Sequence, residues 1–119
     1  MLNLDTHILI HALTDHLTSM EKELLSKNPW SISAIVLWEI AKLSELKRIE
    51  MDLDDPEVAR VLTKIQVWPI DLEVCRHLKR IDFKSNPADE LIAATSLVHR
   101  VPLLTRDTKI LKSKVVPLA

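Results

Sequence analysis

Short apolar runs alternate with longer amphipathic stretches along the whole chain. The short runs have the composition of β-strands and are Leu2–Leu4, Trp30–Ile32, Gln66–Ile70, Pro102–Thr105 and Lys114–Leu118. The longer stretches have helical spacing and are Ile8–Leu13, Leu17–Lys27, Ser33–Lys47, Pro56–Ile65, Leu72–Arg80, Pro87–His99 and Thr108–Leu111. Strands that alternate with helices are typical of α/β domains. We therefore predict an α/β fold with a central, mainly parallel sheet of five strands.

The length and composition of the chain indicate one soluble domain. A chain of 119 residues can build a single core, so 1–119 is predicted to be one domain. Asp5 interrupts the first apolar run and no basic residue precedes it, so no signal peptide is expected. No apolar run approaches the roughly 20 residues of a membrane span. Cys75 is the only cysteine, which excludes an internal disulfide and favours a reducing cytoplasm.

The chain contains no glycine, and this absence excludes two common ways of binding nucleotides. The dinucleotide-binding fingerprint and the P-loop both need glycine for close backbone approach or a positive φ. Aromatic residues are also scarce. A surface that stacks several bases of single-stranded nucleic acid on clustered rings is therefore not expected.

Four acidic residues lie next to apolar segments, where a carboxylate is unfavourable. They are Asp5, Glu39, Asp89 and Asp107. A buried carboxylate costs several kcal/mol unless a cation or hydrogen bonds compensate. Four such residues spread over the chain indicate that the fold gathers them around a positive charge. A divalent metal ion is the simplest candidate, and it points to chemistry on a phosphate-containing substrate.

The predicted elements place these acids where a parallel sheet binds its ligands, beyond the carboxyl ends of its strands. Asp5 ends the first strand and Asp107 follows the fourth. Asp89 lies in the first turn of a helix that starts at Asn86, and Glu39 lies on an inward helical stripe. Asp5, Asp89 and Asp107 also have a simpler explanation, as a helix cap or as a partner of the helix dipole. For Glu39, a surface pair with Lys42 would not explain the apolar residues on both sides of it. The combination of four is far more specific than any one of them.

Other reactive residues are weaker candidates. His7 and His11 have the i, i+4 spacing of two zinc ligands, but the glutamate and third ligand of a zinc-protease motif are absent. We interpret both as surface or partly packed residues, and Cys75 as a core residue. From Arg76 to the C-terminus nine Lys and Arg face four acids, which suits a polyanionic substrate or simply a solvated surface.

Three segments together resemble a known family. Leu4–His7, Ile32–Ile40 and the block Asn86–Thr95, which runs on into Val101–Asp107, are similar in order and spacing to the PIN domain. The pattern most resembles the VapC-type ribonuclease toxins of bacterial toxin–antitoxin pairs, and it covers essentially the whole chain. Relatives usually have a glycine where this chain has Lys47, Arg48 and Ile49, so the preceding helix must end without a glycine cap.

The resemblance implies a three-layer α/β/α domain that cleaves RNA with Mg²⁺ or Mn²⁺. It carries over Asp5, Glu39, Asp89 and Asp107 as catalytic, metal-binding acids, with Thr6 and Thr105 as polar groups that order the site. It also implies a cognate antitoxin and a homodimer as partners. An all-carboxylate site suits such hard cations. Hydrolysis would leave 5′-phosphate and 3′-hydroxyl ends. Candidates to hold flanking phosphates are Arg106, Lys109, Lys112 and Lys114.

One alternative remains, a non-catalytic PIN-like module that would bind a protein or RNA partner without cleavage. Two other classes with acids at strand ends are disfavoured. A phosphotransfer receiver domain would need an acidic pair after the first strand, which is missing, and a haloacid-type phosphatase would need a second Asp where the chain has His7.

The helix that carries Glu39 has more apolar surface than one face requires. Trp38 lies about 100° from Glu39 around this helix, and Leu37, Ala41 and Leu46 add to the apolar surface. We therefore expect an antitoxin segment or a second copy of the chain to cover Trp38. Packing of Trp38 inside the monomer is the alternative.

Overall fold

The computed structural model describes residues 1–119 and contains a four-stranded parallel sheet with the strand order β3-β2-β1-β4. The strands are β1 (Leu2–Leu4), β2 (Trp30–Ser33), β3 (Gln66–Trp68) and β4 (Leu103–Leu104). The helices are α1 (Thr6–Leu13), α2 (Ser19–Lys27), α3 (Ala34–Glu45), α4 (Pro56–Leu62), α5 (Leu72–His77), α6 (Pro87–His99) and α7 (Thr108–Leu111), with a 3₁₀ turn over Leu78–Arg80. The predicted α/β class with a parallel sheet is confirmed.

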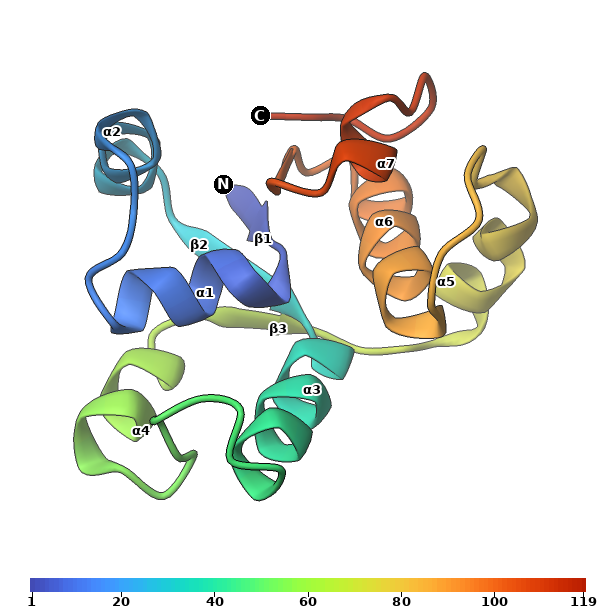
Figure 1. Ribbon diagram of the computed structural model, residues 1–119. Helices are drawn as coiled ribbons and strands as arrows, with labels where there is room; N and C mark the ends of the chain where they lie inside the picture. The colour runs from blue at the N-terminus through green and yellow to red at the C-terminus, as the bar shows by residue number, and fades with distance from the viewer.

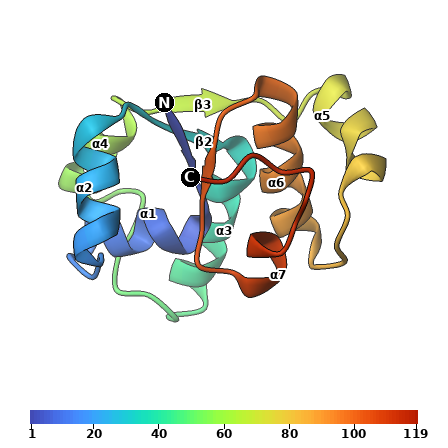
Figure 2. The same ribbon diagram turned by 90° about the horizontal axis from the view of Figure 1, so that it is seen from above.

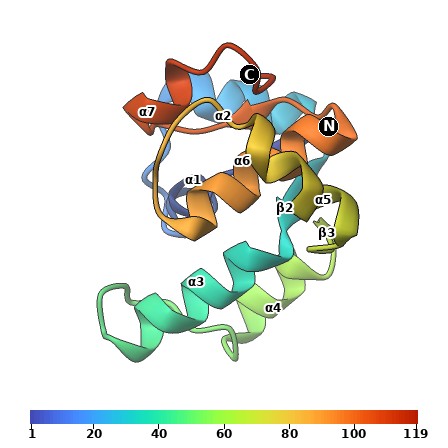
Figure 3. The same cartoon turned by 90° about the vertical axis from the view of Figure 1, so that its right-hand side faces the viewer.

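Helices cover both faces of the sheet. Figure 1 shows α5 and α6 on one side of the strands and α1, α2 and α4 on the other, and Figure 2 shows the same separation from above. In Figure 3, α3 and α4 lie together at the end of the molecule opposite α7. No helix has both the length and the apolar character needed to cross a bilayer.

The alternation of side chains along β1 explains this layering. Leu2 and Leu4 point into the main apolar core, whereas Asn3 lies on the opposite face. The Asn3 amide nitrogen donates to the Ile92 carbonyl (3.3 Å) and to the Ser96 hydroxyl (2.9 Å), both on α6. These bonds tie α6 to the central strand, and α6 carries one of the four acids.

The prediction of a fifth strand at Lys114–Leu118 is wrong for most of that segment. Only Leu118 forms a bridge, parallel to Leu103. The Leu103 amide donates to the Pro117 carbonyl (2.8 Å), and the Ala119 amide donates to the Leu103 carbonyl (3.0 Å). Pro117 has no amide hydrogen with which to continue the ladder. The sheet therefore has four strands, with a single bridge at its β4 edge.

Three helices end at a residue in the left-handed region, a conformation that usually belongs to glycine. Because the chain has no glycine, residues with a Cβ adopt it. These residues are Asp15 (φ 58°), Lys47 (φ 57°) and Arg100 (φ 55°). At the end of α3, the Arg48 amide donates to the Leu43 carbonyl (2.9 Å) and the Lys47 amide to the Ser44 carbonyl (3.0 Å). This is the pattern of a Schellman motif, whose left-handed position is usually glycine. The helix therefore ends in this motif with a lysine at the position that glycine usually occupies.

Replacing Lys47 by Gly should raise the free energy of unfolding by about 0.5–1 kcal/mol. The left-handed conformation costs a residue with a Cβ about 1–2 kcal/mol, and part of the gain is lost to the greater entropy of glycine in the unfolded chain. Urea denaturation at neutral pH measures the change. Lys42→Gly, inside the same helix, is the matched control and should destabilise by about 1 kcal/mol. A destabilised Lys47→Gly would contradict the assigned helix end.

Candidate active site

All four predicted acids line a single pocket of about 450 Å³. Its walls come from α1, from the middle of α3 and from the starts of α6 and α7, helices that follow the strand ends at one edge of the sheet (Figure 1). The lining residues are Asp5, Thr6, His7, Ile8, His11, Glu39, Asn86, Asp89, Arg106 and Asp107. The structure thus brings together Asp5, Glu39, Asp89 and Asp107 as the sequence predicted.

Asp5 is the most buried of the four, with only 6% of its surface exposed. One carboxylate oxygen accepts the Thr6 amide (2.8 Å) at the start of α1, and the other accepts the Thr105 hydroxyl (2.6 Å). Thr105 reaches Asp5 because β4 pairs directly with β1. Burial raises the pKa of Asp5 despite these two hydrogen bonds, and the negative charge of Asp89 raises it further.

Glu39 belongs to the same cluster through Thr6. The Thr6 hydroxyl donates to the Glu39 carboxylate, while the Thr6 amide donates to Asp5. Thr6 therefore contacts two acids at once. Burial raises the pKa of Glu39, and repulsion from Asp89 and Asp5 adds to the effect. The site is therefore short of positive charge, as expected of carboxylates that share one pocket.

Asp89 is held by a residue that the sequence did not single out. The Ser85 hydroxyl donates to the Asp89 carboxylate (2.6 Å), while the Asp89 amide donates to the Asn86 side chain (2.9 Å) that caps α6. The Ser85 amide in turn donates to Glu90 (3.0 Å). Ser85 lies just before the helix cap, and only its position four residues before a suspected acid could have suggested this contact.

Asp107 combines a helix cap with a place in the pocket. Its carboxylate accepts the Lys109 amide (2.8 Å) and the Ile110 amide (3.4 Å), so it caps α7, as the simpler explanation of this residue anticipated. The Asp107 amide donates to the Thr105 hydroxyl (3.0 Å). Thr105 therefore connects Asp107 to Asp5.

The predicted phosphate-binding residues differ in position. Arg106 lines the pocket, but its guanidinium donates to both carboxylate oxygens of Glu21 (2.8 and 2.7 Å) and to the His16 carbonyl (3.0 Å). Lys109, Lys112 and Lys114 are not among the lining residues. His7 is exposed and His11 is half-buried, as predicted, and both line the pocket.

The donors in this pocket fit a hard divalent cation by type. Oxygen ligands with a surplus of negative charge favour Mg²⁺ or Mn²⁺ over softer metals. Burial is the main cause of the raised pKa values of Asp5 and Glu39, and the neighbouring acids raise these pKa values further. No three His, Cys, Asp or Glu side chains surround a common point closely enough to form a complete binding shell. Asp107 and Asp89 are engaged with the α7 cap and with Ser85.

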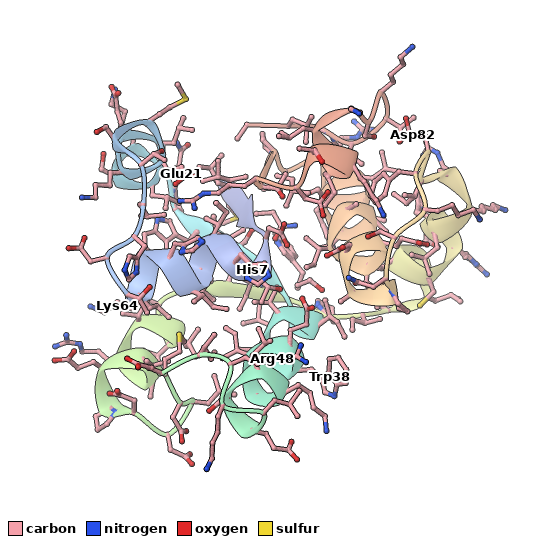
Figure 4. The ribbon with its side chains drawn as sticks, in the orientation of Figure 1. His7, Glu21, Trp38, Arg48, Lys64 and Asp82 are labelled. Carbon is pink, nitrogen blue, oxygen red and sulfur yellow. The ribbon has the colours of Figure 1, made fainter.

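Comparison with known proteins decides the family. The profile of the PIN domain matches residues 3–115, nearly the whole chain. The chain belongs to the PIN-domain family. Figure 4 shows His7 of this PIN domain at the start of α1 and Trp38 on α3. No curated protein sequence matches the chain.

The fold of this PIN domain is similar to those of several toxin–antitoxin structures. A toxin–antitoxin complex from Klebsiella pneumoniae matches with a TM-score of 0.72 and 22% sequence identity, covering 94% of this chain and 91% of that chain. VapBC2 from Rickettsia felis, bound to a promoter DNA fragment, matches with a TM-score of 0.74 and 20% identity, covering 98% and 96%. FitAcB from Neisseria gonorrhoeae matches with a TM-score of 0.72 and 20% identity, covering 99% and 96%. At these identities the similarity establishes a shared fold.

Proposed function

We propose that this PIN domain is a Mg²⁺- or Mn²⁺-dependent endoribonuclease and the toxin of a toxin–antitoxin pair. One observation carries the proposal: Asp5, Glu39, Asp89 and Asp107 line the same pocket at the carboxyl end of the sheet. A purely structural set of helix caps would not need to converge. The toxin–antitoxin neighbours of the same fold support the biological role.

Asp5, Asp89, Asp107 and Glu39 are the residues that would hold the cation. When bound, the ion would supply charge neutralisation and Lewis-acid activation for phosphodiester hydrolysis. Thr6 would hold Asp5 and Glu39 in place. Thr105 would hold Asp5 and Asp107, and Ser85 would hold Asp89. Glu39, which has a raised pKa, is placed to accept a proton from the attacking water.

Positive charge for the substrate would come from Arg106 at the pocket wall and from Lys109 on α7. Arg106 binds Glu21 through Nε and Nη2, whereas its Nη1 makes no hydrogen bond. Nη1 could therefore donate to a phosphate. Lys109 belongs to the basic C-terminal part of the chain that starts at Arg76. Both roles belong to the proposal, together with the cytoplasm as location. Cys75, which was predicted to lie in the core, is instead exposed, and its unpaired thiol suits a reducing compartment.

We further propose a cognate antitoxin as a protein partner, with a homodimer as a second assembly. The exposed apolar residues on and just after α3 support this proposal, because Trp38 is 55% exposed instead of packed inside the monomer. An antitoxin segment that covers Trp38 would also block the neighbouring pocket. Co-expression with the product of the adjacent reading frame, followed by sedimentation of the free and bound protein, tests both assemblies. A free monomer that captures no neighbouring product would contradict them.

The nuclease assignment predicts that purified wild-type protein cleaves single-stranded RNA internally with Mg²⁺ or Mn²⁺ and stops when EDTA is added. The new ends should be 5′-phosphate and 3′-hydroxyl, which end-labelling and ligation distinguish. A protein that binds RNA without cutting it under either metal would favour the alternative, a non-catalytic PIN-like interaction module.

A further inference from the structure

We infer that the Trp38 indole holds one RNA base beside the cleaved phosphate by stacking. This inference rests on the proposed nuclease function and adds to it a residue that binds substrate. It concerns one ring and one base, so the scarcity of aromatic residues does not oppose it. The observations that carry it are the exposure of Trp38, the groove beside it and the continuity of that groove with the acidic pocket.

A second, apolar pocket of about 400 Å³ lies next to the acidic one. It is lined by Ile35, Trp38, Glu39, Asn86, Pro87 and Ala88. Its volume falls within the range of pockets that hold small organic groups, about 300–1,000 Å³. The pocket therefore offers an apolar surface to a small group, with the polar side chains of Glu39 and Asn86 in the same lining.

Glu39 and Asn86 line both pockets, so the two are continuous. A nucleotide whose phosphate lies at the acids would have its base, or that of its neighbour, within reach of Trp38. The Asn86 oxygen is occupied by the Asp89 amide, whereas no partner is recorded for its side-chain nitrogen. That nitrogen is available to donate to a base edge or a phosphate.

The indole is presented to solvent by the geometry of α3. Trp38 is 55% exposed, while its neighbours Val36 and Ile40 are fully buried and fix the helix against the core. Figure 4 shows Trp38 projecting from the side of α3 near the start of α6. Exposing so large a ring is unfavourable unless a ligand covers it.

Charge favours a nucleic acid at this ring. Lys42 lies one helical turn after Trp38 and on the same side. Its only ion pair, with Glu45 (3.4 Å), is largely exposed and therefore weak, so the ammonium remains available to a phosphate. An aromatic ring for a base and a cation for the backbone are the two elements of single-strand binding.

The test compares Trp38→Ala, Trp38→Phe and Leu46→Ala in RNA cleavage. Leu46 is an exposed apolar residue at the far end of α3 and serves as the matched control. Trp38→Ala should lower kcat/KM about 5- to 150-fold, since stacking on an aromatic ring contributes ~1–3 kcal/mol. Trp38→Phe should lose less, and Leu46→Ala should leave kcat/KM unchanged.

Oligonucleotides with one abasic ribose near the cleaved bond identify the base. At a single position, the abasic substitution should lower the kcat/KM of the wild type by about the same factor as Trp38→Ala does. It should lower the kcat/KM of the Trp38→Ala protein only a little further. Independent losses at every position, or a Trp38→Ala protein as active as the Leu46→Ala protein, would overturn the inference. A change in sedimentation with unchanged RNA cleavage would assign Trp38 to a protein interface instead.

The two proposals can fail separately. Normal cleavage by Trp38→Ala would leave the nuclease function intact and overturn the base contact. If the wild type does not cleave RNA at all, the nuclease proposal fails, and fluorescence anisotropy with a labelled single-stranded RNA decides the base contact. Weaker binding by Trp38→Ala than by Leu46→Ala would then support it, and equal binding would overturn it.

Discussion

Replacing Asp5 by Asn should abolish metal-dependent RNA cleavage and, in the absence of metal, stabilise the fold. Asp5 is the most buried acid of the pocket and the one closest to the sheet, so its loss should lower cleavage on the order of 10³-fold. Asn can still accept the Thr6 amide and can donate to the Thr105 hydroxyl, so the local structure should persist. Single-turnover cleavage at saturating Mg²⁺ or Mn²⁺ measures the loss.

The expected stabilisation has a definite pH dependence. Burial raises the pKa of Asp5 above its unfolded value of 3.8, so the native state binds the proton more tightly than the unfolded state does. The ionised form therefore lowers the free energy of unfolding as pH rises above 3.8. Asp5→Asn removes this cost. Its thermal midpoint should exceed that of the wild type at pH 7 with EDTA, and the difference should vanish below about pH 3.8.

Asp54→Asn is the matched control for both effects. Asp54 is exposed and lies in the loop before α4, far along the chain from every residue of the acidic pocket. This variant should cut RNA like the wild type and unfold at nearly the same temperature. If Asp5→Asn also cut RNA at the wild-type rate, Asp5 would have no part in holding a metal ion.

The general fold and the four acids could be predicted because both follow from short-range patterns. Alternating strand and helix signals determine a parallel sheet, and a parallel sheet brings residues that follow its strands to one edge. Asp5 and Asp107 converge for this reason. Glu39 and Asp89 converge because their helices start at the same edge, and their inward positions could be deduced from helical spacing.

The side-chain contacts could not be predicted in the same way, because they depend on loop geometry or join residues that are far apart in the sequence. Ser85 holds Asp89 through a loop geometry that no local pattern encodes. The capture of Arg106 by Glu21 links α2 to the loop after β4, across 85 positions. The predicted fifth strand is reduced to a single bridge for a different reason. Apolar, β-branched residues indicate a strand, but Pro117 has no amide hydrogen with which to continue the ladder.

The pair formed by Glu21 and Arg106 should be the ion pair that contributes most to stability. Glu21 is only 10% exposed at its side chain, and it also closes the capping box of α2 with Thr18. Two charge-assisted hydrogen bonds in a fork are stronger than a single contact. Arg106 is 40% exposed, so solvent screens part of the attraction. Glu21→Gln should therefore lower the free energy of unfolding at pH 7 by about 1–2 kcal/mol.

The contribution of Glu21 to the free energy of unfolding depends on pH with the opposite sign to that of Asp5. The hydrogen bonds from Arg106 lower the pKa of Glu21 to about 2, from 4.5 in the unfolded chain. The stabilisation is fully present above pH 4.5 and is lost as pH falls toward 2. Urea denaturation from pH 7 to pH 3.5 should show the difference between wild type and Glu21→Gln shrinking below pH 4.5. Glu23→Gln, on the same helix, removes an exposed pair with Lys27 and should change stability by no more than about 0.5 kcal/mol.

This pair also matters for the pocket, because Arg106 lies between Thr105 and Asp107. By holding Arg106 against α2, Glu21 fixes the loop that presents Asp107 and the hydroxyl that orders Asp5. Glu21→Gln should therefore reduce RNA cleavage as well, though less than Asp5→Asn, and Glu23→Gln should not. Equal stability of Glu21→Gln and Glu23→Gln at pH 7 would mean that the fork contributes no more than a solvated pair, and that Arg106 is free to serve the substrate alone.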